Sequence, residues 1–263
     1  MVDATQLLHV ALVFTVGSLW VTLVTVITER WGSVIGGVLG GLPSTSAFSF
    51  LFIGLYQSTD AAVEATTVFP LAFGVTCAFL FFYAYFAKKS FVQGIVISLI
   101  IWLAASAAIA ILGINEFVLP LVGGLVISAL TYVAFMKKLK LPNLRGKHKP
   151  FKPHEIVLRG VGAGALVAIS LQLSQIGGPI LGGIAAAFPA VFTSTIVILN
   201  HSMGTEFSRN VTKPLALSGT LTIFPFTIAV RLLFPNIGVW QGTLIAYLLV
   251  VPLAALSYYA MKH

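Results

Sequence analysis

Long apolar runs alternate along the chain with short polar breaks, and the runs have the length of membrane-spanning helices. A helix needs about 20 apolar residues to cross a hydrocarbon core of about 30 Å. Nine such runs occur, at about residues 6–28, 33–56, 62–86, 91–112, 118–136, 156–173, 179–199, 211–234 and 240–260. The pattern therefore predicts an all-α polytopic membrane protein with nine transmembrane helices.

The composition supports this fold class. Hydrophobic residues make up 58% of the chain and charged residues 8%, whereas a soluble globular protein has about 25% charged residues. Asp3 is acidic and no basic segment precedes the first run, so we expect a retained span and not a cleaved signal peptide. The lone cysteine, Cys77, excludes an intrachain disulfide.

The basic residues lie on one side of the predicted spans. They follow spans 1, 3, 5, 7 and 9, with the largest group in the linker between Lys137 and Lys152, while the loops after spans 2, 4, 6 and 8 contain none. Arg231 is the exception, and we expect its long side chain to snorkel to the interface. Because basic residues gather in cytoplasmic loops, the pattern predicts a cell (inner or plasma) membrane location with the N-terminus outside and the C-terminus in the cytoplasm. The same explanation accounts for the net charge of +8 without a nucleic-acid partner.

The second and seventh runs each contain glycines, a proline and hydroxyl residues, at Pro43 and at Pro189. Aligning these prolines, an offset of 146 residues, brings further residues into register. The matched pairs are Gly36-Gly37 with Gly182-Gly183, Asp60 with Glu206, Glu64 with Asn210 and, at an offset of 148, Gln93 with Gln241. Five spans separate the starts of the two repeats, so the repeats point in opposite directions. The predicted organisation is a first repeat at 1–112, a connecting helix with a basic linker at 113–155, and a second repeat at 156–263.

Two segments also carry a family resemblance. Residues 188–193 (FPAVFT) and 60–68 (DAAVEATTV) resemble the pattern of the small bacterial inner-membrane proteins of the GlpM type, which have about half this length. The resemblance covers each half separately and implies two such units fused head to tail through the fifth helix. The halves differ in one respect: Ser44, Thr45 and Ser46 follow Pro43, whereas an apolar segment follows Pro189.

Both interrupted spans are candidate binding sites. A proline in a helix interior removes a backbone hydrogen bond, and the start of the second half-helix then offers free N–H groups and a positive dipole end to an anion. Broken helices at matching positions of inverted repeats are typical of secondary transporters. The candidate substrate-binding residues are Gly40, Gly41, Pro43, Ser44, Thr45, Ser46, Pro189, Thr193, Ser194, Thr195, Gln93 and Gln241. The alternative is that the small and hydroxyl residues only allow close helix packing, and that the two glutamines bond across helices.

Charged and polar residues near the span ends suggest further roles. Glu64, if buried, is a candidate for proton or ion coupling, with Asn210 at the matching position; the alternative is an interfacial glutamate in the first turn of its helix. His201, Arg209 and Lys213 form a candidate cytoplasmic entrance for an anion. The alternative for these three is ordinary anchoring at the interface.

We therefore expect a transporter or facilitator for a small solute, anionic or polar, that works by alternating access around the broken helices. The alternatives are a non-transporting scaffold or accessory subunit and a lipid-handling, scramblase-like protein. No nucleophile elbow, phosphate-binding loop or zinc-protease helix occurs, so we expect neither an enzyme nor a metal or other cofactor. The expected partners are a small-molecule or ion substrate and membrane lipids, with a homo-oligomer left open.

Overall fold

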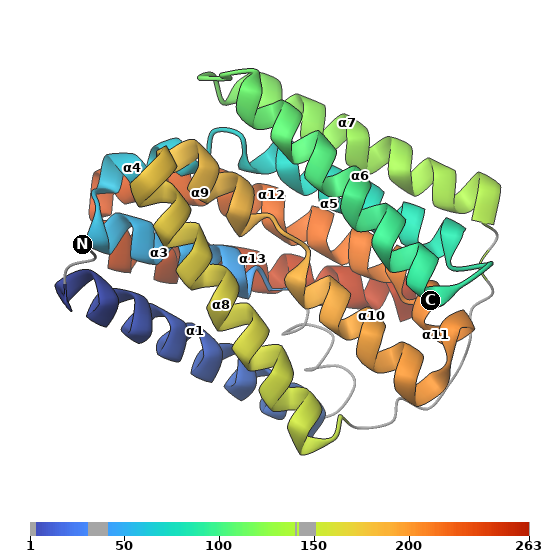
Figure 1. Cartoon of the computed structure of the whole chain (residues 1–263). Coiled ribbons are helices and arrows are strands. Elements are labelled where there is room, and N and C mark those ends of the chain that lie inside the picture. The colour runs from blue at the N-terminus through green and yellow to red at the C-terminus, as the bar shows by residue number, and fades with distance from the viewer. Residues whose placement is uncertain (1–3, 31–41, 140, 142–150, 263) are drawn as a thin grey trace.

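The computed structural model describes residues 4–30, 42–139, 141 and 151–262, and within these ranges the structure is helical without strands (Figure 1). Among these residues, eight segments are long and apolar enough to cross a membrane, and a further apolar helix, Ser44–Tyr56, is shorter. The prediction of an all-α polytopic membrane protein is thus confirmed at this level. The count of nine spans stays a prediction, because much of the second run, including Gly36, Gly37, Gly40 and Gly41, lies outside the described residues.

In the described part of the first half, two helices replace one of the predicted spans. Its helices are α1 (Ala4–Arg30), α3 (Ser44–Tyr56), α4 (Thr59–Ala65), α5 (Phe69–Phe86) and α6 (Phe91–Ile111). The single helix expected over 62–86 is wrong, because α4 begins behind Ser58, whose hydroxyl accepts a hydrogen bond from Ala61 N–H at 3.0 Å. A new helix then starts with Pro70 in its first turn, where the missing N–H is no loss.

The second half repeats this arrangement of long and short helices. After α7 (Val118–Ala134) and the π-helical turn η1 (Phe135–Leu139) come α8 (Pro153–Gly177), α9 (Pro179–Ala186) and α10 (Ala190–Met203). The short α11 (Thr205–Asn210) precedes α12 (Thr212–Ile237) and α13 (Val239–Lys262). The short helices α4 and α11 thus occupy corresponding places before a long helix.

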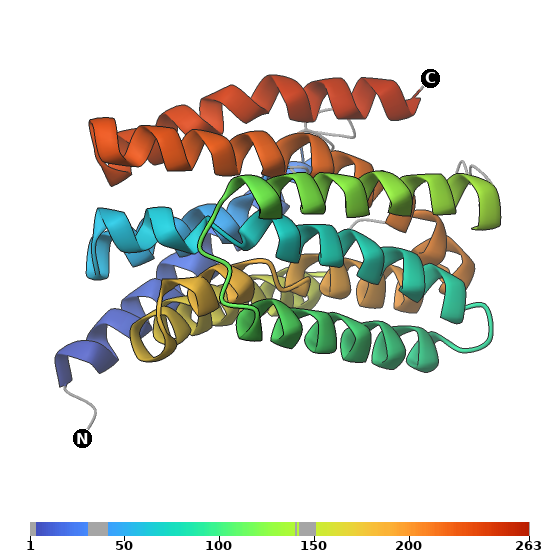
Figure 2. The same cartoon turned by 90° about the horizontal axis from the view of Figure 1, so that it is seen from above.

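Helix α5 lies at the centre of the bundle. Of its membrane-length segment 67% is buried, against 28% for α6 and 22% for α1. Helix α5 packs on α6, α7 and α12, while α1 packs on α8 at the other side. Helix α1 begins at one end of the bundle and α13 ends at the other, together with α11 and the end of α7 (Figure 2). The basic residues of η1 and α11 therefore lie at the same end of the bundle.

Glycines allow two of the closest helix crossings. A Cβ on Gly160 or Gly164 of α8 would meet the side chains of Thr22 or Ser18 on α1, and one on Gly124 of α7 would meet the Pro70 carbonyl at the start of α5. Such small-residue seams are typical of helix packing in membranes. Part of the small-residue content of this chain therefore serves packing.

Candidate functional site at the two helix breaks

The two prolines that the sequence analysis aligns have the same backbone geometry. Pro43 has φ −76° and ψ 54°, and Pro189 has φ −76° and ψ 40°. In each case the residue after the proline donates a hydrogen bond to the carbonyl of the residue before it. Ser44 N–H donates to the Leu42 carbonyl at 2.8 Å, and Ala190 N–H donates to the Phe188 carbonyl at 2.8 Å. These are inverse γ-turns, and each leads directly into the first turn of a helix.

Side chains from two other helices stabilise the interrupted backbone before Pro189. The Thr76 hydroxyl on α5 donates to the Ala187 carbonyl at 2.7 Å, and the Trp102 Nε1–H on α6 donates to Thr76 Oγ1 at 2.9 Å. Trp102 also stacks edge-on against Phe188, with ring centroids 5.1 Å apart. Thr76 and Trp102 therefore satisfy a carbonyl group freed by the break, and sequence reasoning missed both residues.

On the other side of this break, hydrogen-bond donors remain open. Among the described residues, no acceptor pairs with the N–H groups of Val191 and Phe192, and Thr193 Oγ1 is buried without a partner. Ser194 and Thr195, by contrast, both donate to the Val191 carbonyl, at 2.9 and 2.7 Å. Of the three hydroxyls predicted here, Thr193 alone is available for a ligand.

The first break has its own group of unpaired polar side chains. The Tyr247 hydroxyl on α13 lies against Ser44 and the Trp20 indole on α1, yet neither the Tyr247 hydroxyl nor Trp20 Nε1 makes a hydrogen bond of regular geometry, and both atoms are buried. Thr45 shares the first turn of α3, and the Ser46 hydroxyl donates to the Pro43 carbonyl at 3.3 Å. We call Trp20, Ser44 and Tyr247 the first-break cluster. Trp20 and Tyr247 could not be singled out from the sequence, since aromatic residues in apolar spans are usually packing residues.

The two glutamines that recur in the repeats lie away from the breaks. Gln93 and Gln241 are exposed, each as the third residue of its helix, α6 or α13. Gln93 precedes Trp102 by nine residues, which is about 13 Å along a helix. The structure therefore does not bring Gln93 to the break beside Trp102.

Glu64 is exposed, so the condition set for its coupling role, burial, is not met. The reason is that α4 is a separate short helix whose buried positions are Ala62 and Ala65, which turns Glu64 outward. Asn210, at the matching position, differs: its amide nitrogen and oxygen are both buried without partners. A role of Asn210 in coupling stays a prediction.

The three residues predicted to form a cytoplasmic entrance each have different surroundings. Arg209 Nε donates to the Ala84 carbonyl in the last turn of α5 at 2.8 Å, and the Lys213 ammonium lies 5.6 Å from the centre of the Tyr132 ring. His201 is exposed at the end of α10. Arg209 thus stabilises a helix C-terminus, as a cation does favourably.

Arg231, which we expect to snorkel to the interface, makes defined contacts with the end of α4 and with the residue before α7. Its Nη1 donates to the Val63 carbonyl at 3.1 Å and to the Thr66 and Thr67 hydroxyls at 3.2 Å, and its guanidinium lies 4.6 Å from the Phe117 ring centre. The C-terminal carbonyls of α4 attract the guanidinium, which explains its contact with this helix end. No carboxylate among the described residues forms an ion pair with it.

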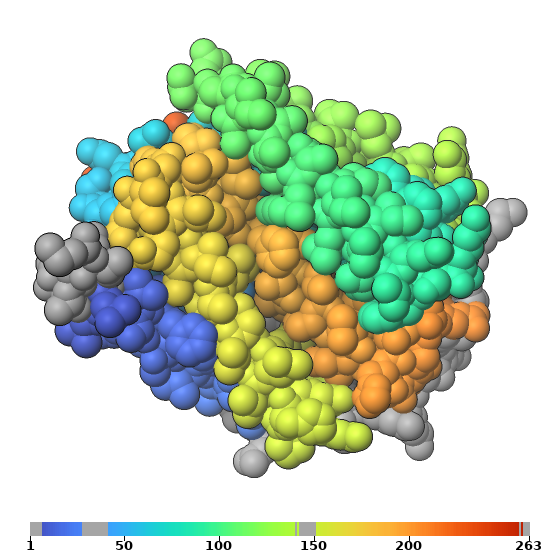
Figure 3. All heavy atoms as spheres, viewed as in Figure 1, coloured from blue at the N-terminus to red at the C-terminus, as the bar shows by residue number. Residues whose placement is uncertain are grey.

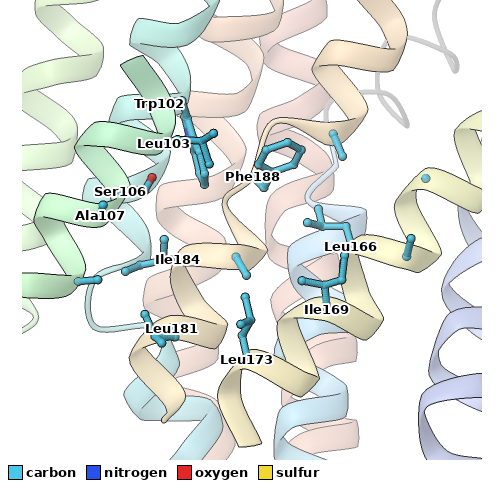
Figure 4. A pocket seen from close by; sticks show the side chains of 15 residues that line it. Trp102, Leu103, Ser106, Ala107, Leu166, Ile169, Leu173, Leu181, Ile184 and Phe188 are labelled. Atoms are coloured by element: carbon cyan, nitrogen blue, oxygen red, sulfur yellow. The ribbon is translucent and has the colours of Figure 1, made fainter. Parts of the chain in front are cut away.

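An apolar groove of about 500 Å³ runs beside the second break. Its walls are α6 and α8, and its floor is α9 with the start of α10 (Figure 4); the space-filling view shows α9 and α10 between the two walls (Figure 3). The lining is aliphatic and aromatic except for Ser106, whose hydroxyl is buried without a partner. Phe188 and Ala190 belong to the groove and flank Pro189, so the groove reaches the break.

Comparison with known proteins finds a family model, which matches the second part of the chain. Residues 156–263 match the model of a family described as "Protein of unknown function (DUF3147)". The searches of curated proteins and of solved structures find no match. The matched segment begins at the residue where the sequence analysis starts the second repeat, while the resemblance to GlpM-type proteins stays a prediction.

Proposed function

We propose that the protein is a secondary transporter or facilitator for a small solute that carries hydrogen-bond acceptors, anionic or polar. In this proposal the chain crosses the inner or plasma membrane nine times, with the N-terminus outside, as two inverted repeats around α7. Alternating access then takes place around the breaks at Pro43 and Pro189. The observation that carries the proposal is the shared γ-turn geometry of the two breaks, each next to buried polar groups that lack partners.

The unpaired groups favour the acceptor class of solute. An indole N–H is a donor only, and Trp20 meets the Tyr247 hydroxyl without a regular hydrogen bond, so an acceptor on a solute would complete this cluster. The backbone N–H groups of Val191 and Phe192 also need an acceptor. Buried polar groups in proteins are almost always hydrogen-bonded, and unpaired ones mark places where a partner is missing. The positive ends of α3 and α10 add to the preference for an anion.

A flux assay tests the proposal. Proteoliposomes that contain valinomycin, so that K⁺ can follow an anion and keep the charge balanced, are challenged with osmotic gradients of potassium acetate, chloride, phosphate or glycerol, and their volume change is followed by light scattering. We expect protein-dependent entry of at least one of these probes. Trp20→Phe keeps an aromatic side chain and removes the donor, and we expect it to reduce entry at least tenfold, as we expect of Pro43→Ala and Thr45→Val.

The matched control is Trp240→Phe, which changes an indole that is 62% exposed and does not belong to the first-break cluster. Entry through this variant should equal that of the unmodified protein. Unchanged flux in folded Trp20→Phe, Pro43→Ala and Thr45→Val would remove the first break from the mechanism. Absence of entry for every probe would contradict transport. The glycine seam between α1 and α8 would then favour the alternative of a non-transporting scaffold.

A second candidate, a lipid-handling protein, is favoured by the groove between α6 and α8. A scramblase needs a path that is open sideways to lipid. The groove fits this need because its lining is apolar and comes from helices of membrane-spanning length. The path also needs polar groups for headgroups, and the groove offers Ser106 alone. A dithionite assay with fluorescently labelled phosphatidylcholine in the same proteoliposomes distinguishes the two functions, and we expect no acceleration of lipid flip.

A further inference from the structure

The groove between α6 and α8 has the dimensions of one membrane leaflet. Its lining extends over residues 102–110 of α6 and 162–173 of α8, which correspond to about 12 and 16 Å along a helix. Half of a hydrocarbon core of about 30 Å is about 15 Å. A spanning partner helix would need a seam along the whole length of both walls, so the groove is too short for one.

The groove opens to the lipid side of the bundle. Leu103 and Ile169 at its rims are 55% and 51% exposed, and both lie on helices that are apolar enough to cross a membrane. Small residues, including Ala107, Ala110 and Ala185, deepen it. Whatever fills this volume must therefore enter from the hydrocarbon of the membrane.

Ser106 adds a polar contact at a defined depth. Its side chain is 5% exposed and its hydroxyl has no partner, although the serines of membrane helices commonly bond to the carbonyl one turn earlier, as Ser98 does to the Gly94 carbonyl at 2.7 Å. Ser106 lies five residues before the end of α6 at Ile111, which is about 8 Å from that end of the helix. At this depth near the interface a phospholipid presents the ester carbonyl from which its acyl chain begins.

We propose that the groove is a binding site for one acyl chain of a phospholipid in the leaflet on the side where α6 ends. The chain lies between α6 and α8 and reaches the break at Phe188, and the Ser106 hydroxyl donates to the ester carbonyl. The site differs from the first-break cluster and does not depend on the transport proposal. It places a lipid in contact with Trp102, whose indole supports the break through Thr76.

Quenching of Trp102 tests the site. A variant with Trp20, Trp31 and Trp240 replaced by phenylalanine is reconstituted in phosphatidylcholine with dibrominated acyl chains and, separately, in unbrominated phosphatidylcholine. Trp102 is 3% exposed, so a chain at the bundle surface reaches it poorly whereas a chain in the groove lies against it. We expect the brominated lipid to lower Trp102 fluorescence at least twofold.

The groove-filling change Ala107→Phe should abolish most of this quenching. Its control is Ala108→Phe, on the same helix, exposed and outside the groove lining, which should leave the quenching unchanged. Equal quenching in the two variants would mean surface lipid only and would overturn the site, as would absence of quenching in both.

A second measurement needs no tryptophan replacement. The otherwise unmodified protein, purified in detergent and freed of loosely bound lipid by gel filtration, should retain about one phospholipid per chain by mass spectrometry. Ala107→Phe should lose it, Ala108→Phe should keep it, and Ser106→Ala should retain less. Retention that is the same in all variants contradicts the site, whereas solute flux reports separately on the transport proposal.

Discussion

At the scale of single residues, the buried Thr76 side chain links α5 to α6 and to the break before Pro189. Its hydroxyl donates to the Ala187 carbonyl and accepts from Trp102 Nε1, so one oxygen atom serves both a free carbonyl and a buried donor. Thr76→Val keeps the shape and leaves both partners unsatisfied. An unpaired buried polar group costs about 1–3 kcal/mol, and we expect a loss of that order or somewhat more in the free energy of unfolding, measured by denaturation in micelles.

Thr227→Val is the matched control for this change. Thr227 is fully buried too, but its hydroxyl makes a single bond, to the Ile223 carbonyl of its own helix at 2.7 Å. That carbonyl keeps its place in the helix when the hydroxyl is removed, so we expect a change below about 1 kcal/mol. Equal losses in the two variants would show that the hydrogen bonds joining Trp102, Thr76 and Ala187 contribute no more to the free energy of unfolding than an ordinary bond within a helix.

At the scale of elements, the seam between α1 and α8 depends on the missing side chain of Gly164. A Cβ there would meet the Ser18 side chain and the Phe14 carbonyl, whereas a Cβ on Gly162 of the same helix would meet nothing within 4 Å. Overpacking of this kind typically costs 1–3 kcal/mol. We expect Gly164→Ala to lower the free energy of unfolding by about that amount.

Gly162→Ala provides the comparison for Gly164→Ala. The change has the same chemistry and lies half a turn away, and alanine is intrinsically better than glycine in a helix by up to about 1 kcal/mol. Gly162→Ala should therefore be neutral or slightly stabilising. If both variants unfold alike, the seam does not require the close approach seen between the two helices.

The elements also show which features of the fold could be predicted from sequence. The break at Pro189 was predictable because proline has no N–H to continue a helix. The short helix α4 was not, because hydropathy over 62–86 is continuous while the helix boundary depends on the Ser58 cap and on Pro70. Without that boundary it is not possible to tell on which face of its helix Glu64 lies, so its exposure could not be predicted.

The candidate sites were predictable to a smaller extent. Ser44 and Thr193 stand out as hydroxyls behind prolines, and the structure places both at the breaks. Trp20 and Tyr247 come from helices at opposite ends of the chain, and only the fold shows that they meet beside Ser44. The groove is made of ordinary alanines and leucines, so no residue pattern distinguishes it from lipid-facing surface.

At the scale of the whole molecule, the arrangement of helix ends fits two repeats of opposite direction. Helix α1 begins and α13 ends at opposite ends of the bundle (Figure 2). Gly94 on α6 and Gly242 on α13 occupy equivalent contacts, since a Cβ on Gly94 would meet Ala87 and one on Gly242 would meet Phe234, each at the end of the preceding helix. The starts of α6 and α13 thus pack closely on the preceding helix in the same way, although four residues connect α5 to α6 and Gly238 alone connects α12 to α13. Inversion requires that these two connections lie on opposite sides of the membrane.

Lys88, just after α5, and Asn236, in the last turn of α12, match at an offset of 148 residues, and both are exposed. In a Cys77→Ala background, Asn236→Cys should react with a membrane-impermeant maleimide in intact bacterial cells, whereas Lys88→Cys should react only after permeabilisation, because basic turns stay in the cytoplasm. Exposed Asn115→Cys and Lys138→Cys, before and after α7, serve as references for the outer and inner sides. Labelling of positions 88 and 236 from the same side would exclude inverted repeats, and with them the alternating-access mechanism proposed for the paired breaks.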